Sequence, residues 1–108
     1  MNYKVLSIPP FDKQFKRLKK KYPSLTTKLI SLIDELKVEP TKGIKIYKNC
    51  YKIRLSLNEN KKGKSGGVRI ITNVKIVENK VILISIYSKS ATSAISEKQI
   101  DNLLKDII

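Results

Sequence analysis

Arg54, Arg69 and Tyr87 are the side chains in this sequence whose types suit chemistry at a phosphate. An arginine stabilises the negative charge that builds up on a phosphate in a transition state, which is generally the largest catalytic contribution. A tyrosine or lysine whose pKa is lowered by neighbouring cations can exchange protons with a substrate. We therefore take Arg54 and Arg69 as candidates for a phosphate clamp, and Tyr87, with Lys89 close by, as the candidate for proton transfer.

Each of these side chains also has a simpler interpretation. Taken alone, Tyr87 is more simply explained as a strand-end aromatic residue that packs on the last helix. Arg54 would then be an outward-facing strand residue paired with Glu59. Cys50 is best interpreted as an inert, half-buried thiol, because buried cysteines behave as small apolar residues.

The residue types that the chain lacks narrow the chemistry further. It has no histidine, which is the usual general base and the commonest metal ligand. Its single cysteine excludes an internal disulfide and a multi-cysteine metal site. Ser65 and Ser88 have no base partner in the sequence, which argues against a nucleophilic serine. Ser-His-Asp triads, Cys-His pairs, zinc hydrolases and histidine-based ribonuclease chemistry are excluded, and we expect no metal and no small-molecule cofactor.

A glycine-bearing loop over residues 61–67 precedes Arg69 and could approach a phosphate with its backbone N–H groups. Its Gly-Lys-Ser triplet resembles part of a P-loop, but the first glycine of that motif is absent and a strand follows in place of a helix. A flexible connection kept soluble by lysines is the alternative. We take Lys64 as the candidate catalytic contact of the loop. The candidates for further contact with a polyanion are Lys45, Lys48, Lys52, Lys61, Lys62, Ser65, Gly66 and Gly67.

The positive charge of the chain is concentrated in its middle third. The 108 residues carry a formal charge of +14, and residues 41–75 alone contain ten basic side chains and one acidic side chain. Residues 76–108 contain four of each kind. Such an asymmetry indicates a face that binds a polyanion. A lysine-rich surface that only maintains solubility is the alternative, and on charge alone we weigh the two equally.

The length allows a single domain, whose N-terminal part is predicted to be a strand followed by two helices. A short strand is expected over residues 3–8. Apolar residues then recur at helical spacing over 11–22 and 25–36, with basic residues on the outside of the first helix. Pro23 ends the first helix and Ser24 can cap the second, so the two form a helical hairpin.

The hydrophobic period then changes to two, which predicts strands. Residues 51–57 alternate between apolar and basic or polar side chains. The polar loop 58–67 follows, and residues 68–77 and 81–87 are rich in β-formers. Asn79 can adopt the left-handed conformation that the tight turn between them requires. We expect these three strands to form an antiparallel meander.

The C-terminal helix has a full set of start signals. Ser96 and Gln99 form a capping box, and Ile95 and Ile100 form a hydrophobic staple. This local stability suggests that the helix is not needed to complete the core. The predicted architecture is α+β, in the order β-α-α-β-β-β-α. The helical hairpin covers one face of a small antiparallel sheet, and the other face presents Lys52, Arg54 and part of the basic loop to solvent.

Nothing in the sequence indicates a membrane span or an export signal. No apolar run approaches the roughly 20 residues that cross a bilayer, and Pro9-Pro10 ends the short apolar start. We expect a cytoplasmic protein. A basic amphipathic helix over residues 13–21 that lies on a membrane surface is kept as a minor alternative.

Three segments, in this order, resemble the successive motifs of the RelE/ParE superfamily of toxins. They are residues 51–54 (Tyr-Lys-Ile-Arg), 63–71 (Gly-Lys-Ser-Gly-Gly-Val-Arg-Ile-Ile) and 86–90 (Ile-Tyr-Ser-Lys-Ser). The second is similar to the G-K-S-G-G-x-R signature of a RelE/HigB-like branch. The resemblance extends over the whole chain, including the helical hairpin and the start of the last helix. It implies a RelE/ParE-like α+β fold.

The resemblance also implies the toxin of a type II toxin–antitoxin module. RelE-like members are endoribonucleases that cut mRNA, often on the ribosome, whereas ParE-like members poison DNA gyrase with the same fold. The signature and the basic strand–loop–strand segment favour the RelE-like function. A gyrase-directed toxin, or a homologue that binds RNA but cleaves it weakly, is the alternative.

The sequence departs from the pattern of these relatives at two places. Thr72-Asn73 stands where relatives often have an aromatic residue, and Ser88 and Ala91 stand near an acidic or amide position. These departures concern catalytic strength more than RNA binding. The expected partners are mRNA, the ribosome and a cognate antitoxin that covers Arg54, Arg69 and Tyr87 or displaces the terminal helix.

Overall fold

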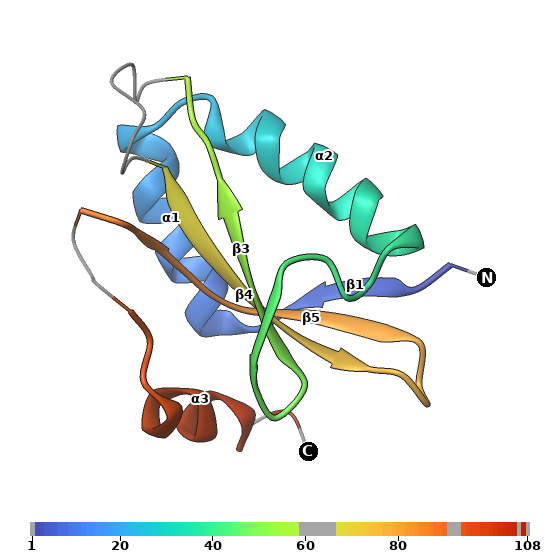
Figure 1. Ribbon diagram of the computed structural model, residues 1–108. Helices are drawn as coiled ribbons and strands as arrows, with labels where there is room; N and C mark the ends of the chain where they lie inside the picture. The colour runs from blue at the N-terminus through green and yellow to red at the C-terminus, as the bar shows by residue number, and fades with distance from the viewer. Residues whose placement is uncertain (1, 59–66, 91–93, 106, 108) are drawn as a thin grey trace.

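The computed structural model describes residues 2–58, 67–90, 94–105 and 107, which form five strands and three helices (Figure 1). Their order differs from the predicted one only by an additional strand, β2. The elements are β1 (Lys4–Ser7), α1 (Pro9–Lys21), α2 (Leu25–Val38), β2 (Ile44–Tyr47), β3 (Cys50–Leu55), β4 (Val68–Lys75), β5 (Lys80–Ser88) and α3 (Glu97–Leu104).

The strands form one sheet in the order β1-β5-β4-β3-β2. The meander of β3, β4 and β5 is antiparallel and is thus confirmed, as is the β4–β5 turn, where Asn79 has a φ of 55°. β1 pairs with β5 in parallel, so the first strand lies beside the last. β2 was not predicted, because its four residues lie between two turns and are too few for a clear alternation.

The two faces of the sheet each carry a hydrophobic core. The apolar sides of α1 and α2 pack on one face, around residues such as Phe11, Leu36 and Ile70. The predicted helical hairpin is therefore confirmed. The apolar side of α3 packs on the other face, where Ile100 is 1% exposed and contacts the cluster that contains Ile84. The expectation that α3 is not needed for the core is wrong, because its buried stripe closes this second core.

The helix ends agree with the sequence at α3 and differ at α2. Ser96 and Gln99 form the predicted capping box, with both reciprocal hydrogen bonds present. Ser24 stands at the N-cap of α2 but makes no capping hydrogen bond with its side chain. Its Oγ instead accepts a bond of 3.2 Å from the backbone N–H of Asn58. Ser24 thus links the start of α2 to the end of β3.

The apolar side of α1 is occupied within the protein. Phe11 is 2% exposed, and Phe15 and Leu18 pack against the same core. A surface helix that binds a bilayer needs that side for the lipid, so this packing argues against the membrane-surface alternative for residues 13–21. Among the helices that the structure describes, none combines the length and the hydropathy needed to cross a membrane.

Candidate nucleic-acid interface

Arg54, Arg69 and Tyr87 lie side by side across three strands. Arg54 on β3 is directly opposite Arg69 on β4, and Arg69 is directly opposite Tyr87 on β5. Directly opposed residues of antiparallel strands project from the same face. A residue adjacent to each of them in its strand faces the core beneath α1 and α2; these adjacent residues are Ile53, Ile70 and Ile86. The three candidate side chains therefore form one row, here called the Arg-Arg-Tyr row, on the face that α3 partly covers.

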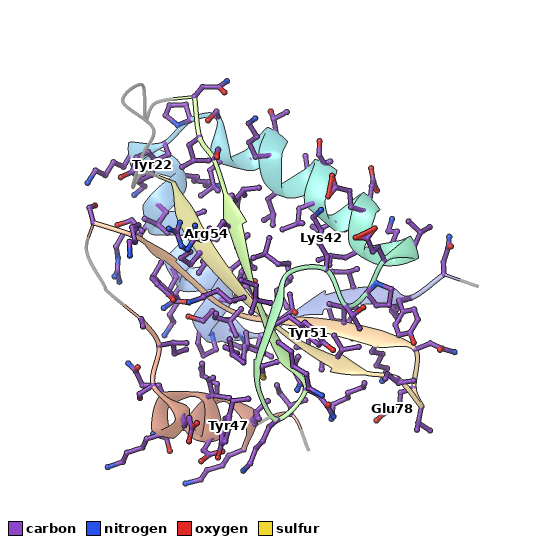
Figure 2. The ribbon with its side chains drawn as sticks, in the orientation of Figure 1. Tyr22, Lys42, Tyr47, Tyr51, Arg54 and Glu78 are labelled. Atoms are coloured by element: carbon purple, nitrogen blue, oxygen red, sulfur yellow. The ribbon has the colours of Figure 1, made fainter. Side chains whose placement is uncertain are left out.

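The members of the Arg-Arg-Tyr row differ in their exposure. Arg54 is exposed to solvent (Figure 2), whereas Arg69 is 7% exposed and Tyr87 is 9% exposed. A nitrogen of Arg69, Nη1, donates a long hydrogen bond of 3.4 Å to the carbonyl of Val68. Two guanidinium groups on one face of adjacent strands repel each other and attract an anion. Arg54 is the member that a ligand from solvent reaches first.

Tyr87 is set up to give a proton and not to take one. Burial raises the pKa of Tyr87 above its ordinary value, and the Ile95 backbone and the Arg69 guanidinium only partly oppose this effect. The expectation that nearby cations lower this pKa is thus wrong, because desolvation is the larger influence. Within the described part of the chain, the buried hydroxyl has no partner with good hydrogen-bond geometry. At neutral pH it is a phenol to which the described residues offer no well-placed acceptor.

Gly67 has a structural reason to be glycine. Its φ is +84°, and a Cβ placed there would lie 2.3 Å from the carbonyl oxygen of Leu55. Its own carbonyl accepts a hydrogen bond of 3.2 Å from the N–H of Lys89. This bond fixes the chain just after Tyr87 beside the start of β4. The other loop candidates lie outside the described residues; they are Lys61, Lys62, Lys64, Ser65 and Gly66.

The remaining lysine candidates are not all near the row. Lys52 lies two residues from Arg54 on the same strand, so it shares the face of the row and is half-buried. Lys45 is exposed and lies opposite Tyr51, which projects from the other face. Lys48 lies in the turn between β2 and β3. At about 3.3 Å per strand residue, this turn is more than about 13 Å from Arg54.

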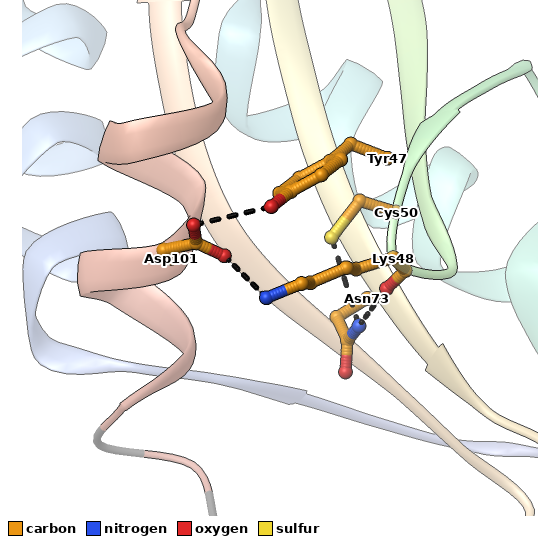
Figure 3. Close-up of polar contacts among 5 residues, drawn as sticks. All are labelled: Tyr47, Lys48, Cys50, Asn73 and Asp101. Atoms are coloured by element: carbon orange, nitrogen blue, oxygen red, sulfur yellow. Dashed lines mark hydrogen bonds and ion pairs between the residues drawn. The ribbon is translucent and has the colours of Figure 1, made fainter.

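Lys48 is held by a partner that the sequence did not reveal (Figure 3). Its Nζ lies 2.8 Å from Oδ1 of Asp101 on α3, and the Tyr47 hydroxyl donates a bond of 3.1 Å to the other carboxylate oxygen. The bond between Lys48 and Asp101 raises the pKa of the lysine and lowers that of the carboxyl group. Lys48 therefore attaches α3 to the sheet, and its contact with RNA stays a prediction.

The departures at Thr72 and Asn73 lie inside the protein. Thr72 is fully buried, and the Asn73 amide donates to the carbonyl of Lys48 at 3.2 Å and to the Cys50 sulfur at 3.6 Å. Burial raises the pKa of the Cys50 thiol, which agrees with an unreactive role, although the residue is fully and not half buried. Thr72 and Asn73 are thus part of the buried structure of the sheet. Ala91 lies outside the described residues.

Two solved structures show which known protein has this architecture. The chain superposes on a free E. coli toxin RelE that carries two arginine-to-alanine substitutions, with a TM-score of 0.63, 20% identity and full coverage of both chains. The chain has the fold of RelE. The intact E. coli RelBE toxin–antitoxin complex matches at a TM-score of 0.50 and 24% identity, over 78% of this chain and 93% of that one.

The sequence itself gives no such match. No protein-family model and no curated protein matches it. The likeness to RelE therefore lies in the arrangement of strands and helices, and the Arg-Arg-Tyr row has to be judged on its own chemistry. In chemical terms, the row offers two fixed positive charges and one neutral phenol along about 10 Å, the width of three strands.

Proposed function

We propose that this protein is the toxin of a type II toxin–antitoxin module and a RelE-like endoribonuclease of the branch with the G-K-S-G-G-x-R signature. It cuts mRNA on the ribosome, without a metal, by attack of a ribose 2′-hydroxyl on the adjacent phosphate. The observation that carries the proposal is the Arg-Arg-Tyr row, because it aligns charge stabilisation and a proton donor on one face of a RelE-like sheet.

Each member of the row has its own task in this reaction. The 2′-hydroxyl loses its proton to a solvent water and its oxygen attacks phosphorus while the bond to the 5′-oxygen breaks, which leaves a 2′,3′-cyclic phosphate and a 5′-hydroxyl end. Arg54, the exposed member, binds the phosphate oxygens as their charge increases. Tyr87, whose raised pKa keeps its hydroxyl protonated, gives its proton to the leaving 5′-oxygen. Arg69 lies between them and positions both.

Cleavage of an mRNA on purified translating ribosomes tests this proposal. We expect the wild-type protein to cut the mRNA and to leave a 2′,3′-cyclic phosphate. An otherwise identical mRNA with one 2′-deoxyribose at the cut position is the matched control and should stay intact there. No cleavage by an active preparation would contradict the proposal, and inhibition of DNA gyrase by the same preparation would support the gyrase-directed alternative.

The same proposal includes a cognate antitoxin as the partner. The RelBE structure is a toxin–antitoxin complex of a protein with this fold, and a partner with acidic residues and apolar anchors suits a chain with a charge of +14. Hydrogen exchange with and without the product of a neighbouring reading frame tests this. We expect protection over residues 52–69 or 87–108, and no protection in either segment would contradict this mode of neutralisation.

A further inference from the structure

Within the described residues, the outer edge of β3 has no strand beside it beyond Lys52. The pairing of β2 with β3 starts at Ile44 opposite Lys52, and no described strand pairs with the outer edge of residues 53–55. Gly43 makes this possible. It has a φ of +102°, and a Cβ there would lie 2.5 Å from the Lys52 carbonyl oxygen. The chain thus turns close against β3 at this point and leaves the rest of its edge open toward α2.

A cavity of about 350 Å³ lies between this open edge and α2. Its apolar lining comes from side chains that the core already fixes, Leu32 at 2% and Ile53 at 3% exposure. Lys28, Leu32 and Glu35 line it from α2, and their spacing of four and three residues places them on one side of that helix. The walls are therefore built from rigid elements.

The polar lining of the cavity is mostly cationic. Lys28, Lys42 and Arg54 contribute positive charge, and among the described residues Glu35 is the one acidic member of the lining. The Lys42 Nζ lies 3.2 Å from a Glu35 oxygen, and both side chains are more than a third exposed. Hydroxyl groups of two serines complete the lining and can donate hydrogen bonds to an anion. This set of groups suits a phosphate.

Arg54 belongs both to this cavity and to the Arg-Arg-Tyr row. Figure 2 shows Arg54 on β3 and Lys42 in the turn that leads from α2 to β2. Since neighbouring strands are about 4.8 Å apart, the open edge of β3 lies about 10 Å from β5 and its tyrosine. A single RNA strand that crosses the row from β5 toward β3 therefore leaves the sheet at this cavity.

We propose that the cavity between α2 and the open edge of β3 is a phosphate subsite, which binds the backbone of the RNA strand next to the cleavage position. This inference rests on the proposed function, because it needs an RNA strand on the row. In the unbound protein the Glu35 carboxylate pairs with Lys42, one of the cations of the subsite. An arriving phosphate competes with Glu35 for Lys42, so the acidic side chain weakens RNA binding.

Binding of a labelled single-stranded uridine oligonucleotide, measured over a range of KCl concentrations, tests the subsite. The double variant K28Q/K42Q should bind more weakly, and its plot of log K against log salt should be shallower by about 0.7 for each lost phosphate contact. The matched control is K98Q/K105Q, which removes one exposed lysine in α3 and one directly after it, both outside this cavity. We expect its slope to change by less.

A change with the opposite sign strengthens the test. Glu35→Gln should raise the affinity for the oligonucleotide by about two- to fivefold, the equivalent of one exposed ion pair. Asp34→Asn removes the same charge from the next residue of α2, where the acid pairs with Lys37 at 3.5 Å outside the cavity. It should have a smaller effect, since only Glu35 competes for a subsite lysine.

The two proposals can fail separately. If the wild-type protein binds the oligonucleotide with no salt dependence, both the proposed function and the subsite are wrong. If it binds in a salt-dependent way but K28Q/K42Q equals K98Q/K105Q, and Glu35→Gln equals Asp34→Asn, only the subsite is wrong. Urea unfolding of all four variants, expected to lie within about 0.5 kcal/mol of the wild type because none of the changed side chains is buried, checks that the fold is kept.

Discussion

Arg54 and Arg69 differ in environment although they are neighbours on one row. Arg54 is open to solvent and forms part of a cavity wall, while Arg69 is buried between Arg54 and Tyr87. The buried Arg69 is hydrogen-bonded within the protein. A substitution that removes such bonds leaves buried polar groups without partners, and this lowers the free energy of unfolding. Substitutions at the two positions should therefore separate a surface contact from a positioning role.

Arginine-to-lysine substitutions test this difference, because lysine keeps the charge but loses the planar fork. We expect each to lower the rate of ribosome-dependent cleavage on the order of a hundredfold. Arg54→Lys should leave the free energy of unfolding within about 0.5 kcal/mol of the wild type, whereas Arg69→Lys should cost about 1–3 kcal/mol. Normal cleavage by either variant would remove that residue from the site, and the unfolding curves show whether a loss is structural.

Tyr87→Phe separates stability from activity. The buried hydroxyl lacks a well-formed hydrogen bond in the described structure, so its removal should leave the free energy of unfolding unchanged or slightly higher. Cleavage should fall by about a hundredfold or more if the phenol is the proton donor. Tyr51→Phe is the control on the other face and should keep its activity. A fully active Tyr87→Phe variant would mean that this tyrosine is only a packing residue.

At the scale of the elements, Gly67 joins the start of β4 to the ends of β3 and β5. Gly67→Ala should cost at least about 1–2 kcal/mol, because alanine is strained at its positive φ and the new Cβ would meet the Leu55 carbonyl. Cleavage should fall with it as the chain near Tyr87 shifts. Ser56→Ala, an exposed neighbour, is the control for unfolding only, because Ser56 lines the cavity beside α2. Urea unfolding measures the loss of stability of Gly67→Ala, and an unchanged midpoint would show that alanine is not strained at this position.

The helix α3 should behave as part of the core. Ile100→Ala removes a fully buried side chain from the second hydrophobic cluster and should lower the free energy of unfolding by about 2–5 kcal/mol. Lys98→Ala, on the exposed side of the same helix, should change it by less than about 0.5 kcal/mol. Chemical denaturation of both variants decides between them. If the two variants are equally stable, α3 does not contribute to the core.

Most of the fold follows from local patterns, and the parts that do not follow depend on distant contacts. Alternation over 51–57 and the capping box at Ser96 were sufficient to predict β3 and α3. The ion pair of Lys48 with Asp101 joins residues 53 positions apart, and no local pattern encodes it. Tyr87 was selected by type, but its burial, which reverses the expected direction of its pKa shift, depends on distant residues of the second hydrophobic cluster such as Ile100.

At the scale of the whole molecule, the charge asymmetry should govern affinity for nucleic acid. Residues 41–75 carry a net charge of +9. The plot of log K against log salt for single-stranded RNA should therefore fall by several units per decade, with about 0.7 for each neutralised phosphate. Changing Lys61 and Lys62 to Gln should make it shallower. A slope near zero, measured by fluorescence anisotropy, would contradict a polyanion-binding face.

The parallel pairing of β1 with β5 also fixes the order in which the protein can be completed during its synthesis. The first strand leaves the ribosome early, but its partner begins only at Lys80. Contacts so distant in sequence form late, after the intervening chain exists. Tyr87 belongs to the same β5, so a nascent chain that ends before this strand lacks both the sheet edge and the Arg-Arg-Tyr row. A ribosome that makes this protein is thus exposed to the assembled row only near the end of translation.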